Sequence, residues 1–462
     1  MSGRSVTVVA ACVVVAGAVA GGVLYASDVR PAGSEGTGKL ATVAEKAPPA
    51  PRWEAAGAVL DTAWARETAQ TSVVALARTL ESVAGDESAG GHVGAAVVDL
   101  ASGELIFETN ASDPFVPAST MKILTGTAAL EVLGPDHRFV TSVTGRLSGD
   151  AEITLVGGGD PLLASSRSAA REPSAAGLDV LAERTAESLV PAGVTSVRLS
   201  FDDGLFAGPA VDPDWRPSYV PDGVAGPVNA LAVDGARRSP GFRERVSDPA
   251  QATAELFAEL LDDHGVEVNG APRRTAADAA DDEVASVTSP ALSTVVEFMM
   301  RTSDNDVAEV LARHVALGLD RPGSSEEAAE AVTDALAGLG VEVDGLDIRD
   351  GSGLARDNAV TAGSLISALQ AAAEPEMPHL RPVLAGLPVA GFTGTLAERV
   401  SGDSAGYVRA KTGTLTGVHS LAGLAARPDG QAYLFAILAD DADDALAARG
   451  VLDDFAAVLV AE

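Results

Sequence analysis

Lysine is the scarcest charged residue of this 462-residue chain, since it occurs only at Lys39, Lys46, Lys122 and Lys411. The remainder of the 32 basic side chains are arginines. Arginine stays protonated in proteins, whereas a lysine that is removed from water can lose its proton. Lys39 and Lys46 lie in a stretch rich in Pro, Gly and Ala. Lys122 and Lys411 therefore mark positions where chemistry could require an amine.

Positive charge is scarce overall, because 65 Asp and Glu residues give a net charge of −33. Binding to nucleic acid or to an anionic lipid surface depends on clustered basic side chains, so neither partner is expected. We interpret the acidity as a solvated surface that keeps the protein soluble. The length predicts two or three domains, and a hydrophobic content of 47% is enough to form real cores.

Cysteine and paired histidines are also missing. Cys12 is the only cysteine, so the sequence after it can form no internal disulfide and no cysteine metal site. No close pair and no H-E-x-x-H motif is present among the histidines, which are His92, His137, His264, His314, His379 and His419. We therefore expect neither a metal ion nor another cofactor.

The first residues predict export from the cytoplasm. Residues 1–27 contain an uncharged, mostly apolar run after Arg4, which is typical of a secretory signal peptide or an uncleaved membrane anchor. Residues 28–58 have the composition of a flexible linker. Either form of the first segment places the remaining chain outside the cytoplasm, in contact with a membrane only through that segment if it is uncleaved.

The rest of the chain predicts an α+β fold. A helix over 63–83 precedes two strands, 92–100 and 104–110, that are joined by a tight turn. Three antiparallel strands and a closing helix are predicted between 406 and 460, and the early hairpin could share one sheet with them. Helical patterning runs from about residue 291 past Leu365. We predict one domain from 59–139 and 290–462, with an antiparallel sheet flanked by helices and a helical subdomain, interrupted by an inserted α/β module at 140–289.

The stretch "PASTMKILT" (117–125) places Ser119 and Lys122 at a predicted helix start. Positions three apart share one helix face, so the hydroxyl and the amine can come within hydrogen-bond reach. A serine needs an adjacent base to become a useful nucleophile, and a lysine that gives up its proton can supply one. The pair alone is weak evidence, because serine is also a common helix cap.

Two further motifs follow in the sequence. Ser303-Asp304-Asn305 lies between two predicted helices, so a hydroxyl and a carboxamide can enter one cleft from a loop. On a predicted strand, Lys411-Thr412-Gly413-Thr414 offers a second cation and two hydroxyls that can bind a carboxylate. We expect Gly413 to let a substrate backbone approach closely.

In this order the three motifs resemble the signature of the penicillin-recognising serine enzymes. More narrowly, the chain resembles peptidase family S13, the D-alanyl-D-alanine carboxypeptidase/endopeptidases or class C low-molecular-mass penicillin-binding proteins. The resemblance runs from about residue 60 to the end. It includes the stretches "LVGGGDPLL" (155–163), "DDGLFAGPAVDPDW" (202–215), "DGSGLARDN" (350–358) and "LPVAGFTGTLAERV" (387–400).

The resemblance implies a penicillin-binding transpeptidase-like fold and a serine D-Ala-D-Ala carboxypeptidase, with or without endopeptidase activity, that acts on peptidoglycan stem peptides and is acylated by β-lactam antibiotics. Ser119 would be the nucleophile and Lys122 its base. Ser303 and Lys411 would relay a proton to the leaving amine, and Asn305 would orient the substrate amide.

The substrate-binding residues are implied in the same way. Thr412, Gly413 and Thr414 would line the site, with the two threonines holding the substrate carboxylate. Arg356 matches a position that contacts the stem peptide in relatives, and Asp203, or its neighbour Asp202, could do likewise. Residues 123–302 separate the first two motifs, which is a longer interval than a single-domain β-lactamase needs but shorter than in the longest family members. An accessory subdomain could therefore be reduced or missing.

Two alternatives share these motifs. A class A β-lactamase adds a deacylating Glu with an Asn four residues later, and no Asn occurs between Asn305 and Asn358. A penicillin sensor or wall-binding protein with little turnover is the other alternative, which the two reactive lysines make less attractive without excluding it.

Overall fold

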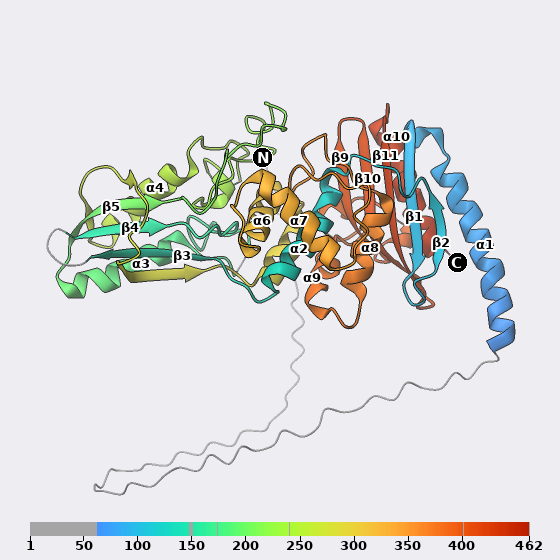
Figure 1. The fold of residues 1–462 in the computed structure, drawn as a ribbon, viewed down its shortest axis with the longest axis horizontal. Helices are drawn as coiled ribbons and strands as arrows, with labels where there is room; N and C mark the ends of the chain where they lie inside the picture. The colour runs from blue at the N-terminus through green and yellow to red at the C-terminus, as the bar shows by residue number, and fades with distance from the viewer. Residues whose placement is uncertain (1–61, 147–150, 173, 240, 401, 462) are drawn as a thin grey trace, which may run out of the picture. The chain divides into compact units, whose positions relative to one another are not determined.

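The computed structural model describes residues 62–146, 151–172, 174–239, 241–400 and 402–461 (Figure 1). The predicted signal peptide or anchor and the linker lie outside the described residues. In the part that the structure covers, none of the helices combines the length and apolar character needed to cross a bilayer.

A five-stranded antiparallel sheet unites the two ends of the described chain. Its strand order is β2-β1-β11-β10-β9. The strands are β1 (His92–Asp99), β2 (Leu105–Thr109), β9 (Val408–Leu415), β10 (Val418–Ala426) and β11 (Ala432–Asp440). β1 pairs with β11 along its whole length, from His92 opposite Asp440 to Asp99 opposite Tyr433. The predicted hairpin and the predicted three-strand meander thus share one sheet.

Helices cover both faces of this sheet (Figure 1). α1 (Thr62–Ala84) and α10 (Ala445–Val460) lie on one face, and α8 (Ala362–Ala373) lies on the other. The remaining helices pack beside α8 as a helical group: α2 (Met121–Leu133), α5 (Leu292–Thr302), α6 (Asn305–Gly318), α7 (Ser325–Gly338) and α9 (Pro382–Ala385). Successive strand residues point to opposite faces, so Val97 and Phe435 pack against α1 and α10. Val98 and Leu434 join the core formed with α2 and α8. β11 is buried on both faces, which explains its nearly continuous run of apolar residues.

Helix α2 lies inside the second of these cores. Ten of its residues, from Met121 to Leu130, are buried, and they pack among α5, α6, α7 and α8. A helix that is apolar on all sides is stable only when it is surrounded in this way. The first turn of α2 therefore brings any polar side chain it carries into a water-poor environment.

The chain between α2 and α5 builds a second, mixed sheet with the order β6-β5-β4-β3-β8, and β7 also pairs with β5. Its strands are β3 (Val140–Arg146), β4 (Glu152–Val156), β5 (Ser196–Asp202), β6 (Glu267–Val268), β7 (Arg273–Arg274) and β8 (Asp282–Thr288). β4 and β5 are parallel, as the crossover through α3 (Leu178–Leu189) requires. Helices α3 and α4 (Pro249–Asp263) pack on this sheet around a separate hydrophobic core. We call residues 140–289 the inserted segment.

One sequence expectation differs from the structure, because the helical pattern does not continue unbroken past Leu365. α7 ends at Gly338 and α8 begins at Ala362, with an irregular segment between them. The Asp350 carboxylate accepts hydrogen bonds from the amides of Gly353 and Ala355, at 2.7 and 2.6 Å. Local carboxylate-to-amide bonds of this kind favour turns over helix.

Gly94 in β1 offers a test of the packing. A Cβ atom at this position would lie 2.3 Å from the ring of Phe115, which is itself fully buried. We expect Gly94→Ala to lower the free energy of unfolding by about 1–3 kcal/mol through overpacking, measured by urea denaturation. Gly450→Ala is the matched control, since Gly450 is an exposed position of helix α10 where a Cβ meets nothing within 4 Å. It should raise stability by about 0.5–1 kcal/mol. Equal stability of the two variants would contradict the described packing.

Candidate active site

Ser119 lies in a single 3₁₀ turn, Ala118–Thr120, directly before α2. Ala118 adopts a left-handed backbone conformation with a φ of 46°, which is unfavourable for a residue with a side chain. Two glycines lie so close to this turn that a side chain at either position would clash with it. A Cβ atom at Gly353 would lie 1.8 Å from the Ala118 carbonyl oxygen, and one at Gly413 would lie 2.6 Å from that of Pro117. The surrounding backbone thus holds the serine in a constrained, half-buried position.

The Lys122 side chain is fully buried and points back to this serine. Its Nζ atom donates to Ser119 Oγ at 2.9 Å, to Asn305 Oδ1 at 2.8 Å and to the Ser352 carbonyl oxygen at 2.7 Å. Burial lowers the pKa of Lys122 to about 8, although nearby carboxylates, Asp350 first, oppose that shift. The amine can therefore give up its proton close to neutral pH.

The partners of Lys122 also fix the direction of its lone pair. An ammonium has three N–H bonds, and three oxygens accept them here. The Asn305 and Ser352 oxygens are carbonyl-type acceptors and donate nothing. When Lys122 loses one proton, these two oxygens retain its remaining N–H bonds, and the lone pair faces Ser119 Oγ. The geometry suits a base that takes the proton of this hydroxyl.

Behind Lys122 lies a buried acidic scaffold that sequence reasoning missed. The Glu309 carboxylate on α6 accepts the Ser352 amide at 2.8 Å and so positions the carbonyl that binds Lys122. Burial, together with the nearby Asp350 carboxylate, raises the pKa of Glu309. In the stretch 350–358 the sequence resemblance implies a role only for Arg356. The Asp and Gly content of this stretch is typical of a tight turn and is the sequence signal for the buried Asp350 and Ser352.

Ser303 and Lys411 form the second polar pair. Ser303 connects α5 to α6 in a left-handed conformation with a φ of 58°. Lys411, fully buried in β9, donates from Nζ to Ser303 Oγ and to the Thr412 carbonyl oxygen, both at 2.8 Å. Burial and the charge of Lys122 hold the pKa of Lys411 well below its usual range. The structure thus brings the three sequence motifs together around two buried amines.

The last motif differs in one respect from the sequence expectation. At Gly413 a Cβ atom would lie 2.1 Å from Ser420 Oγ and 3.1 Å from the Cβ of Ala118. The space that a side chain at Gly413 would occupy is therefore filled by the protein itself and not left for substrate. The glycine is needed so that β9 can lie close to the Ser119 turn. Thr412 Oγ1 donates to Thr395 Oγ1 at 2.8 Å, a partner that sequence reasoning missed. Thr414 is exposed at the strand edge, and its hydroxyl donates to the Gly413 carbonyl oxygen.

The two remaining candidates lie apart from these pairs. Arg356 donates to the carbonyl oxygen of Thr416 in the turn between β9 and β10. Asp203 lies in the inserted segment, where it pairs with Arg274 at 3.0 Å and accepts from Asn229 at 2.9 Å. It lines a cavity of about 450 Å³ in that segment. Its neighbour Asp202 accepts the amides of Gly204 and Ala277. Across the described residues, no group of three or more His, Cys, Asp or Glu side chains is arranged to hold a metal ion.

Comparison with solved structures defines the class of fold. The structure is similar to penicillin binding protein 4 (dacB) from Haemophilus influenzae, with a TM-score of 0.70 at 21% identity over 83% of this chain and 99% of that one. The predicted α+β fold of the penicillin-binding type is therefore confirmed.

Sequence comparison gives the family. The chain is 35% identical to carboxypeptidase Rv3627c of Mycobacterium tuberculosis over 86% of this chain and 85% of the relative. It is 33% identical to carboxypeptidase DacB of Mycolicibacterium smegmatis over 92% of both. The profile of the D-Ala-D-Ala carboxypeptidase 3 (S13) family matches residues 76–245 and 238–459. The chain belongs to this family of serine-type D-Ala-D-Ala carboxypeptidases, as the resemblance of its motifs indicated.

The lowered pKa of Lys122 can be measured directly. A chain labelled with [ε-¹⁵N]lysine contains only four lysines, so its amine spectrum is simple. We expect the Lys122 signal, assigned by its loss in Lys122→Met, to titrate near pH 8, against about 10.4 for an unperturbed lysine. A Lys122 signal that titrates at the unperturbed value would contradict the described burial.

Proposed function

We propose that Ser119 and Lys122 are the nucleophile and base of a D-Ala-D-Ala carboxypeptidase that works through an acyl-enzyme. The observation that carries this proposal is the 2.9 Å contact between Ser119 Oγ and a fully buried Lys122 amine with a lowered pKa. Ser119 Oγ attacks the carbonyl carbon between the terminal D-alanines of a stem peptide, and its proton passes to Lys122 Nζ. The carbonyl π electrons move onto the oxygen to form a tetrahedral oxyanion.

Collapse of this intermediate needs a proton at the leaving amine. We propose that the proton taken up by Lys122 is relayed through Ser303 Oγ to this amine, which returns Lys122 to its neutral form. Lys411 assists the relay, because its Nζ contacts Ser303 Oγ at 2.8 Å. The C–N bond breaks, free D-alanine leaves, and the peptide remains bound as an ester of Ser119. Water then attacks the ester, which releases the shortened peptide as a carboxylic acid and restores the serine hydroxyl.

The other residues of the proposed site bind and orient the substrate. The backbone N–H groups of Ser119 and Thr414 serve as the oxyanion hole, which typically contributes a few kcal/mol to lowering the barrier. Thr412 and Thr414 hold the terminal carboxylate beside the Lys411 amine, and Gly413 between them lets β9 lie close to the serine turn. Asn305 orients the peptide amide. Arg356 and Asp203 are proposed to contact the stem peptide farther from the reacting bond.

We further propose that 59–139 and 290–462 form the catalytic domain and that 140–289 is an accessory domain. The separate sheet and core of the inserted segment support this division. Peptidoglycan lies outside the cytoplasm, so the enzyme works there, either released or held by its N-terminal segment. β-Lactams are proposed as covalent inhibitors of Ser119; a β-lactam is bound in a second structure of Haemophilus influenzae penicillin binding protein 4.

Labelling with a fluorescent penicillin tests the nucleophile. We expect one adduct per chain, mapped by mass spectrometry to Ser119 and absent from Ser119→Ala, together with release of D-alanine from a stem peptide. Ser112→Ala is the control, because Ser112 is exposed on the loop before the serine turn. Equal labelling of Ser119→Ala would exclude the assignment. An adduct without D-alanine release would instead indicate a sensor, and rapid hydrolysis of the penicillin a β-lactamase.

The base is tested by pH and by a substitution that retains charge. Only the neutral amine accepts a proton, so the acylation rate should fall about tenfold per pH unit below the Lys122 pKa of about 8 and level off above it. Lys122→Arg keeps the charge but cannot release its proton, and it should slow acylation by about 10²–10⁴-fold. A stopped-flow rate that is independent of pH between 6 and 9, or an active Lys122→Arg variant, would refute the assignment.

A further inference from the structure

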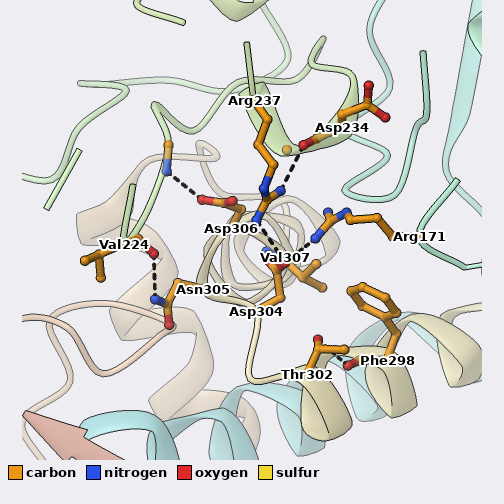
Figure 2. A network of polar contacts seen from close by, with 12 residues as sticks. Arg171, Val224, Asp234, Arg237, Phe298, Thr302, Asp304, Asn305, Asp306 and Val307 are labelled. Carbon is orange, nitrogen blue, oxygen red and sulfur yellow. Dashed lines mark hydrogen bonds and ion pairs between the residues drawn. The ribbon is translucent and has the colours of Figure 1, made fainter. Parts of the chain in front are cut away.

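The orientation of the Asn305 carboxamide is set by the inserted segment. Its Nδ2 donates at 2.8 Å to the carbonyl oxygen of Val224, a group that can only accept (Figure 2). The nitrogen must therefore face Val224, which leaves Oδ1 directed at Lys122 Nζ. If the amide were reversed, Oδ1 would face the Val224 carbonyl oxygen, so that two acceptors would meet. Nδ2 would then face Lys122 Nζ, so that two donors would meet. The loop that carries Val224 thus fixes one of the three contacts that aim Lys122 at Ser119.

A backbone hydrogen bond and two arginine–carboxylate contacts hold the same loop against the start of α6. We call residues 224–239 and 241–246 the strap. Its Gly226 amide donates to Asp306 Oδ1 at 2.6 Å. Its Arg245, with a side chain only 2% exposed, lies 2.9 Å from Asp306 Oδ2. Its Arg237 approaches Asp304 to 3.9 Å. The two carboxylates flank Asn305 in the sequence, so the strap contacts the motif on both sides.

A third arginine completes this cluster from another loop of the inserted segment. Arg171 forms an ion pair with Asp304 and lies over the ring of Phe298, with Cζ 5.3 Å from the ring centre (Figure 2). Asp304 also caps α6 by accepting the Val307 amide at 3.1 Å. Burial disfavours the Asp304 carboxylate, but Arg171 and Arg237 outweigh burial and hold its pKa below its usual range. Three guanidinium groups thus face two carboxylates around one catalytic motif.

The strap adopts an unfavourable backbone to reach this position. Asp234, Gly235 and Ala236 have successive φ values of 53°, 64° and 57°. Left-handed conformation is rare for residues with side chains, and such strain persists only where the surroundings enforce it. The carbonyl oxygens of Asp234 and Gly235 accept hydrogen bonds from Arg237 and Arg245, respectively. The strained turn therefore aligns the guanidinium groups that contact α6.

We infer that the strap residues in contact with Asn305 and its two flanking carboxylates, together with Arg171, are positioning residues of the catalytic site, which hold Asn305 and thereby aim the Lys122 amine at Ser119. This inference rests on the proposed function, and it gives the inserted segment a direct part in the reaction. Arg171, Arg237 and Arg245 act through Asp304, Asp306 and Asn305. They touch neither the reacting serine nor its base.

The cluster also contributes to the electrostatics of the base. Burial lowers the pKa of Lys122, and four carboxylates oppose that shift: Asp350, Glu309, Asp304 and Asp306. Lys411 is the basic group that faces Lys122 from β9, and burial together with the charge of Lys122 lowers its own pKa. The strap arginines offset the charge of Asp304 and Asp306. Removal of one arginine leaves the carboxylates less compensated, which favours the protonated amine and moves the pKa of Lys122 upward.

The strained turn supplies the first test. Gly235→Ala adds a Cβ atom 2.5 Å from Arg237 Nη1 and 3.2 Å from Asp306 Oδ2. Gly241→Ala is its matched control, because Gly241 lies in the same strap with a φ of 83°, but a Cβ there meets nothing within 4 Å. Both substitutions carry the backbone penalty of a left-handed alanine. We expect Gly235→Ala to slow penicillin acylation by about 10- to 100-fold, while Gly241→Ala retains the wild-type rate. Equal rates in folded variants would refute the inference.

The arginines supply the second test, through Arg237→Gln and its neighbour Arg238→Gln. Arg238 pairs only with Glu244 among described acidic side chains, with both side chains more than half exposed. We expect Arg237→Gln to move the acid limb of the acylation profile to higher pH, Arg237→Lys to restore part of the shift, and Arg238→Gln to leave it unchanged. A purely structural role would lower the thermal midpoint without moving this limb.

A readout that is independent of catalysis separates the two proposals. The Lys122 amine of the [ε-¹⁵N]lysine-labelled chain is titrated in wild type, Arg237→Gln and Arg238→Gln. An upward shift of the Lys122 pKa that occurs only in Arg237→Gln supports the inference about the strap. This holds even if the wild-type chain forms no penicillin adduct, a result that would refute only the proposed function. An adduct in the wild type with identical Lys122 titrations and identical acylation rates in all three proteins would refute the strap and leave the proposed function intact.

Discussion

The exclusion of water from the Lys122 amine is the constraint on which the site depends. An ammonium without solvent must find all its partners within the protein, and the structure supplies three oxygens from three separate segments. Burial alone would drive the amine to its neutral form, and the four surrounding carboxylates hold the balance near pH 8. The buried α2, the acidic scaffold on α6 and the turn around Ser352 all serve this one group.

The second buried basic group is also a lysine, for a related reason. Lys411 Nζ fits between two acceptors, Ser303 Oγ and the Thr412 carbonyl, each at 2.8 Å. A guanidinium group is planar and carries five N–H donors, which would need more acceptors than this enclosed position on β9 provides. A compact ammonium also tolerates desolvation by releasing its proton, which arginine does not do. The scarcity of lysine in the chain thus reflects two buried positions with the same requirement.

The sequence predicted most of the architecture because its signals are local. Alternating strands, a helical period and Gly- or Pro-rich turns identified the hairpin, the final meander and the helices on both sides of Ser303. The three motifs predicted which side chains would meet. The sequence could not predict Glu309, Thr395, Arg171 or the strap arginines that contact α6, because each acts through a pairwise contact between segments far apart in the chain. Arg171, Arg237 and Arg245 look like ordinary surface arginines until their carboxylate partners are located.

The long separations within the site have a consequence for biogenesis. The partners of Lys122 at Asn305 and Ser352 lie 183 and 230 residues farther along the chain. In an unfolded chain the amine is solvated and titrates near about 10.4, so it stays protonated and leaves the serine hydroxyl inert. The buried amine with its lowered pKa forms only when the C-terminal half has packed against α2. A chain that has not finished folding therefore carries an unreactive Ser119, and the proposed chemistry begins only when folding is complete.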